Sequence, residues 1–141
     1  MKSIPAIKRV MTPFPYSVDV NISVPEARTF MREQRIKHLP VTEEGKLVGI
    51  ISDRDLLNVL VTNESDSTVR VRDIYVEEPY VVDLNDRLDN VLYTMAERRI
   101  GSALVTRHGK LAGVFTVTDA CRSFAEFLRA PLKPAGGDEA A

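Results

Sequence analysis

The sequence GKLVGIISDRD at residues 45–55 decides the fold, because it occurs a second time as GKLAGVFTVTD at residues 109–119. Both copies begin with a glycine and a lysine. Both end with a hydroxyl residue followed three positions later by an aspartate. Outward from this stretch, residues 7–56 align with residues 71–120 without a gap, and 16 of the 50 aligned positions are identical. The chain therefore contains an internal repeat.

Each repeat is predicted to contain a strand, a helix, two strands joined by a hairpin turn, and a second helix. Ser23 and Glu26 have the spacing of a capping box, which favours a helix start at this point. Asn85 or Asp86 is the expected cap of the equivalent helix in the second repeat. The turns at 43–45 and 107–109 contain glycine and predict hairpins. The other expected elements are strands at 16–20, 80–84, 47–51 and 111–115, strands beginning at 39 and 103, and second helices beginning near Asp53 and Val117.

The repeats also set the expected domain boundaries. We expect the first repeat at residues 1–61, a polar linker at 62–68, the second repeat at 69–128, and a flexible tail rich in Pro, Gly and Ala at 129–141. A unit of about 60 residues is marginal for a core of its own, so the two repeats are expected to pack on each other.

Composition and charge exclude several classes of protein. The chain has 141 residues, of which 44% are apolar and 28% are charged, as in a folded domain. Its net charge of -1 lacks the positive field that non-specific nucleic-acid binding needs. No apolar run approaches the ~18–20 residues of a membrane span. Residues 1–9 contain no continuous apolar segment, so we expect no signal peptide. We therefore expect a cytoplasmic protein that binds neither membranes nor nucleic acid.

The residue types that commonly carry catalysis or metal binding are scarce. Cys121 is the only cysteine, which excludes an internal disulfide, and its place in an apolar-spaced helix predicts a small core residue. One cysteine and two histidines, His38 and His108, are too few ligands for an ordinary structural zinc site. The sequence contains no Walker loop and no signature of a Ser or Cys nucleophile beside a histidine. We predict that the chain is not an enzyme.

The hydroxyl residue and the aspartate at the end of each repeated stretch have two interpretations. Ser52 and Thr116 can cap the following helix, with Asp55 and Asp119 in its first turn. Alternatively, free N–H groups at the helix start can attract phosphate, and the aspartate can accept hydrogen bonds from the two hydroxyls of a ribose. The interpretations are compatible, because a capping hydroxyl can also face a ligand.

The chain resembles a tandem pair of CBS domains, the regulatory module named after cystathionine beta-synthase and also called a Bateman module. The resemblance rests on VMTP at residues 10–13, IKHLPV at 36–41, the stretch 45–55, and the second copies of these motifs. It covers about residues 5–128. It implies an α+β fold of two βαββα repeats related by a pseudo-twofold axis, with small mixed sheets and helices on one face. It also implies two clefts between the repeats that bind AMP, ADP, ATP or S-adenosylmethionine, with no required cofactor.

The resemblance also assigns roles to individual positions. Asp55 and Asp119 would each hold a ribose, and Thr12 and Val76 would approach the base in the site of the other repeat. Tyr75-Val76 departs from the usual Met-Thr pair. The other implied contacts lie near the ribose and phosphate (Ser52, Arg54, Thr116 and Thr118) or on the strands that line the clefts (Ile36, Lys37, His38, Ile100, Gly101 and Ser102).

The two clefts are not expected to be equivalent. The first has Lys37, His38 and Arg54, which can oppose a phosphate, whereas Gly101, Ser102 and Thr118 occupy the corresponding positions of the second. Charged hydrogen bonds are stronger than neutral ones, so the first site is predicted to prefer phosphorylated nucleotides. An ordinary solvated strand end is the alternative interpretation of Lys37 and His38.

Two functions are compatible with these features. The first is a ligand sensor without activity of its own, which signals to a partner protein that the sequence does not identify. The second is a structural oligomerisation or docking module whose capping motifs bind no ligand. A homodimer is expected in either case, because the family usually associates through its helices and the last helix has more apolar surface than one repeat covers.

Overall fold

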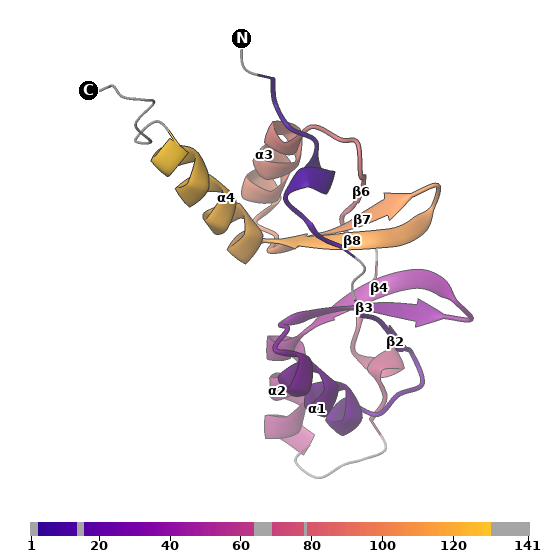
Figure 1. The fold of residues 1–141 in the computed structure, drawn as a ribbon. Coiled ribbons are helices and arrows are strands. Elements are labelled where there is room, and N and C mark those ends of the chain that lie inside the picture. Colours follow the sequence, from indigo (N-terminus) through magenta and orange to yellow (C-terminus); the bar gives the residue numbers. More distant parts are fainter. Residues whose placement is uncertain (1–2, 14–15, 64–68, 78, 131–141) are drawn as a thin grey trace.

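The computed structural model describes residues 3–13, 16–63, 69–77 and 79–130, and these form two lobes whose sheets face each other (Figure 1). Most of the expected linker, at 64–68, and the tail from residue 131 lie outside the described residues. The lower lobe in Figure 1 contains helices α1 and α2, and the upper lobe contains α3 and α4. The architecture is α+β, as predicted.

The element order confirms the duplication. The first repeat contains β2 (Val18–Asp19), α1 (Val24–Gln34), β3 (His38–Glu43), β4 (Lys46–Ser52) and α2 (Asp53–Asn63). The second contains β6 (Val81–Asp83), α3 (Leu88–Arg98), β7 (Ser102–Arg107), β8 (Lys110–Thr116) and α4 (Val117–Arg129). Each repeat also has an opening segment, formed by a 3-10 turn and a short strand: η1 (Ile7–Arg9) with β1 (Thr12–Pro13), and η2 (Val71–Asp73) with β5 (Val76–Glu77).

The starts of the first helices differ between the repeats. Ser23 caps α1 in the predicted capping box with Glu26. The expected caps of α3 were wrong, because its N-cap is Arg87 and no side chain caps the helix there. Asp86 instead accepts a hydrogen bond from the backbone N–H of Asp83 at 3.0 Å, which closes the preceding turn. This local turn uses the carboxylate that the helix start would otherwise need.

The two hairpin turns have the backbone shape that their sequences predict. Glu44 and Gly45 have φ of 51° and 80°, and His108 and Gly109 have φ of 52° and 78°. Positive φ at both central residues matches the right-handed twist of the flanking strands. The turns therefore join β3 to β4 and β7 to β8, and the register of each pair shifts once, between Val41 and Thr42 and between Val105 and Thr106.

Each repeat gives its opening segment to the other lobe. β1 pairs with β8 in the sheet β1-β8-β7-β6, and β5 pairs with β4 in the sheet β2-β3-β4-β5. Ile7 is buried in the core of the second repeat, and Val71 is buried in the core of the first. Each lobe is therefore built from residues of both repeats.

The two sheets pack through β4 and β8. Ile50, Leu104 and Val114 form a buried cluster between them. The helices of each lobe lie on the outer side of its sheet (Figure 1). This arrangement places the ends of β4 and β8, where the repeated hydroxyl and aspartate residues occur, beside the seam between the repeats.

The last helix differs from its prediction in one respect. Cys121 is exposed rather than a core residue, because Ala120 is the neighbour that packs against the second core. Phe124, Phe127 and Leu128 are more than half exposed, at 61%, 54% and 54%.

Within the described part of the chain, no helix has both the length and the apolar character that a bilayer crossing demands.

Candidate functional site

The end of β4 and the start of α2 form the centre of the first candidate site. The backbone N–H of Ser52 donates to Oδ2 of Asp55 at 3.0 Å, and the N–H of Asp55 donates to Oγ of Ser52 at 3.1 Å. The N–H of Asp53 donates to the carbonyl oxygen of Lys37 at 2.9 Å. The capping interpretation is therefore confirmed. The cap uses the N–H of Asp55, and the Lys37 carbonyl uses the N–H of Asp53, so neither group is available to an anion here.

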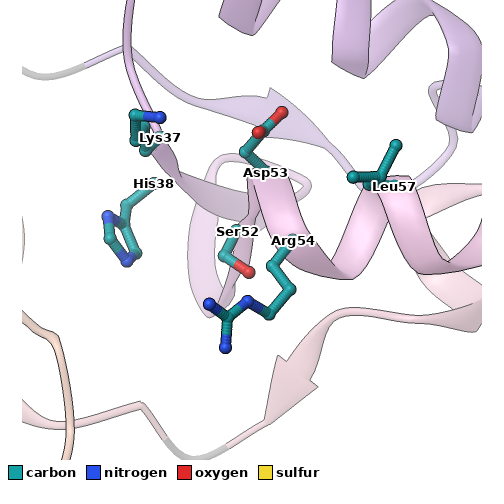
Figure 2. Close-up of a pocket in the computed structure, with 6 residues that line it drawn as sticks. All are labelled: Lys37, His38, Ser52, Asp53, Arg54 and Leu57. Carbon is teal, nitrogen blue, oxygen red and sulfur yellow. The ribbon is translucent and has the colours of Figure 1, made fainter.

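A cavity of about 440 Å³ opens beside this helix start. Four of the residues selected from the sequence line it, and Figure 2 shows Ser52 and Arg54 on the same side as the His38 ring, while the Asp53 carboxylate points the opposite way. Arg54 and Lys37 are exposed, so each can reach a ligand without leaving a packed position. The full lining is Lys37, His38, Ser52, Asp53, Arg54 and Leu57.

Sequence reasoning missed two of these lining residues. Asp53 and Leu57 lie four positions apart on α2 and both border the cavity, although the Asp53 carboxylate points away from the His38 ring (Figure 2). The spacing itself was the available signal. The sequence predicts Asp53 only as the start of the second helix, and Leu57 gives no indication of a cavity.

His38 lies where the two repeats meet. It pairs with Ser52 across β3 and β4, and its Nε2 is 3.9 Å from the place where a side chain at Gly101 would begin. Burial lowers the pKa of His38, and the nearby charge of Asp55 opposes that shift without cancelling it. The imidazole is therefore held mainly in its neutral form near pH 7, and a bound anion would favour its protonation.

The two isoleucines selected from the sequence do not line this cavity. Ile36 packs against the core of the first repeat, and Ile100 packs against the core of the second. Ile100 and Gly101 border a different cavity of about 450 Å³, which lies between α3 and α4. Ile36 and Ile100 therefore mainly pack in the cores of their repeats.

The second aspartate is buried and fully engaged. Asp119 is 5% exposed, and its Oδ2 accepts from the backbone N–H and the hydroxyl of Thr116 at 3.0 and 3.3 Å. Its Oδ1 accepts from Thr12 at 3.4 Å and from Arg122 at 3.1 Å. Arg122 was not selected from the sequence, although its place three residues after Asp119 on a helix was a usable signal.

The remaining selected residues surround these two centres. Val76 is 49% exposed and pairs with Ile50, in the register that Thr12 has with Val114. Ser102 pairs with Thr116 and is half-buried, and Thr118 is exposed at the start of α4. The structure thus brings four selected residues, Lys37, His38, Ser52 and Arg54, to one cavity whose lining does not include Asp55. It brings Thr12 and Thr116 to Asp119. Within the ranges that the structure describes, no cluster of His, Cys, Asp or Glu could hold a metal ion.

Comparisons with known proteins agree with this geometry. The family described as CBS domain matches twice, at residues 7–62 and 71–126. The chain is 31% identical to YlbB of Bacillus subtilis (strain 168) over 115 residues, which are 80% of this chain and 78% of YlbB. Two longer relatives have the names of enzymes. The match spans 24% of L-aspartate semialdehyde sulfurtransferase of Methanocaldococcus jannaschii and 20% of inosine-5'-monophosphate dehydrogenase of Thermoplasma acidophilum.

Solved structures show the same architecture. The CBS domain pair of protein MJ0100, solved with 5'-methylthioadenosine and S-adenosyl-L-methionine, has a TM-score of 0.81 and 27% identity, and the match covers 89% of this chain and 99% of that chain. CBSX2 in complex with AMP has a TM-score of 0.74 and 28% identity, again over 89% and 99%. The chain belongs to the CBS-domain family and is a tandem CBS-domain pair.

Proposed function

We propose that this protein is a non-catalytic regulatory module that binds an adenosine-containing ligand at the seam between its repeats. The observation that carries the proposal is the cavity at the start of α2, which Lys37, His38 and Arg54 line beside the cap formed by Ser52 and Asp55. Relatives of the same architecture were crystallised with AMP and with S-adenosyl-L-methionine. AMP, ADP, ATP and S-adenosylmethionine are accordingly the candidate ligands.

The chemistry of the first site suits a phosphorylated nucleoside. A ribose presents two adjacent hydroxyls, and a carboxylate such as Asp55 can accept a hydrogen bond from each. Lys37 and Arg54 can neutralise a phosphate, and His38 can add a positive charge once it is protonated. We therefore propose that the Asp55 site prefers AMP, ADP or ATP to uncharged adenosine.

Binding can act on a partner through the arrangement of the repeats. Because each lobe contains the opening segment of the other, a ligand at the seam contacts elements of both. A ligand shifts such an equilibrium only by its difference in affinity for the two arrangements. We propose that a regulated protein in the cytoplasm binds the two arrangements of the repeats with different affinity.

We further propose that two copies associate through the exposed face of α3 and α4. This face carries Leu92, Tyr93, Phe124, Phe127 and Leu128, which are 37–72% exposed. An apolar cavity of about 280 Å³ between Leu88 and Phe127 continues the same face.

Ligand titration tests the proposed function. Calorimetry with AMP, ATP, adenosine and S-adenosylmethionine is carried out on the full chain and on Asp55→Asn, which keeps an oxygen for the helix cap. We expect binding of a phosphorylated nucleotide that weakens in Asp55→Asn. Thermal unfolding gives a second readout, because a ligand at about 100 times its Kd adds roughly 2.7 kcal/mol of stability. Dimerisation without binding of any of the four compounds would instead favour a structural docking module.

A further inference from the structure

We propose that Arg122 masks Asp119, so that the second cleft of the pair takes a ribose only after this arginine is displaced. The inference rests on the proposed adenosine binding and assigns a specificity role to a residue outside the repeated motif. Its consequence is an ordered pair of sites, in which the Asp55 site fills first.

The contacts of Asp119 leave little capacity for a ribose. A carboxylate offers about four lone-pair positions for hydrogen bonds. Thr116 uses two of them on Oδ2 through its backbone N–H and its hydroxyl. Thr12 and Arg122 use two on Oδ1. Both ribose hydroxyls would have to donate to the same carboxylate, so a ribose competes with the present donors.

Arg122 is the donor that can leave. The Thr116 contacts cap α4 and are tied to the helix start, whereas Thr12 is held in β1 by pairing with β8. The Arg122 side chain is 61% exposed, and its partner Asp119 is 7% exposed. Its guanidinium can rotate into water, which supplies replacement hydrogen bonds at once. Displacement is therefore feasible, but it costs part of the ligand's binding energy.

The first repeat has different residues at the two equivalent positions. Val76 occupies the place of Thr12 and has no hydroxyl, and Asn58 occupies the place of Arg122 and has no charge. Arg54, the cation of the first repeat, instead lines the cavity in front of its helix. Arg54 thus lies at the cavity where a phosphate could bind, whereas Arg122 contacts the carboxylate that is proposed to bind the ribose.

Replacing Arg122 by the residue of the first repeat isolates this effect. Arg122→Asn is made in the Asp55→Asn background, so that only the second site is read, and adenosine and AMP are titrated by calorimetry. We expect roughly three- to tenfold tighter adenosine binding than in Asp55→Asn alone, in line with the loss of a partly exposed ion pair. The reverse change, Asn58→Arg in an Asp119→Asn background, should weaken adenosine binding at the first site. Circular dichroism checks that all variants remain folded.

Two results would overturn the masking role. One is unchanged adenosine affinity in Arg122→Asn. The other is weaker AMP binding with unchanged adenosine binding, which would make Arg122 a phosphate ligand. Failure of the proposed function is a separate outcome, because Asp119→Asn, which keeps the Asp55 site, would then bind neither AMP nor adenosine.

Discussion

The hydroxyl of Thr12 donates a hydrogen bond to Oδ1 of Asp119 at 3.4 Å, although the two residues are 107 positions apart. Thr12 lies in β1, the opening strand of the first repeat, and Asp119 lies in the first turn of α4 in the second. The contact exists because β1 is built into the sheet of the other repeat beside Gly113. The Asp119 site is therefore formed by residues of both repeats.

This exchange requires a glycine where the opening strand crosses. A side chain at Gly113 would begin 2.6 Å from Sδ of Met11 and 2.8 Å from the carbonyl oxygen of Thr12. We expect Gly113→Ala to lower the free energy of unfolding by roughly 1–3 kcal/mol, as overpacking does in other cores. Urea denaturation measures this change.

Gly101→Ala is the matched control. Its first side-chain carbon would have only Nε2 of His38 nearby, at 3.9 Å, which is ordinary contact. The control should be as stable as the natural chain or slightly more stable, because alanine restricts the unfolded state. Equal stability of the two variants would show that β1 does not approach the sheet as closely as described.

Much of this architecture could be predicted from the sequence. The repeated stretch, the hairpin turns and the Ser23 cap are local patterns, and each formed the expected element. The exchange of opening segments could not be predicted from these patterns, because it depends on which sheet β1 and β5 join. The local pattern at Cys121 failed for a related reason, since α4 buries only part of its apolar face within one chain.

The candidate site was predictable to a smaller extent. Lys37, His38, Ser52 and Arg54 line one cavity, because β3 ends beside the start of α2. Arg122 was missed, because the resemblance assigned roles only to motif positions, although its spacing from Asp119 on one helix was a usable signal. The residues that line the cavity depend instead on which elements meet in three dimensions, and this information is absent from local sequence patterns.

His38 predicts a dependence of stability on pH. Burial lowers its pKa in the folded state below the ordinary value of 6.5. The unfolded chain therefore binds a proton first as the pH falls through 6.5, and the folded state loses stability over this range. We expect His38→Gln to lose less stability than the natural chain between pH 7.5 and pH 5.5, measured by urea denaturation at each pH. A natural chain with the same pH slope as His38→Gln would contradict the burial of this imidazole.

Arg54 predicts a preference for phosphate at the first site. Arg54→Gln should weaken AMP binding by roughly three- to tenfold, because an exposed charged hydrogen bond is lost, and should leave adenosine binding unchanged. Arg107→Gln makes the same change at an exposed arginine at the end of β7, which was selected for neither site, and should have little effect on either ligand. Calorimetry compares the two variants, and an equal loss of adenosine and AMP binding in Arg54→Gln would remove the proposed phosphate contact.

The α3 and α4 face predicts the oligomeric state. We expect light scattering to give a dimer for the natural chain and a monomer for Phe127→Glu, because a charge in an apolar interface is costly to bury. Lys110→Glu changes the charge in the same direction in a hairpin turn and should remain dimeric. A monomeric natural chain at moderate concentration would exclude this interface.

A crystal structure of the full chain with AMP tests the proposed adenosine site most directly. We expect the nucleotide at the seam, with both ribose hydroxyls within hydrogen-bond distance of the Asp55 carboxylate and the phosphate near Arg54 or Lys37. Well-ordered AMP bound away from the start of α2, or crystals grown at saturating AMP in which the carboxylate contacts only its own capping partners, would contradict the proposal.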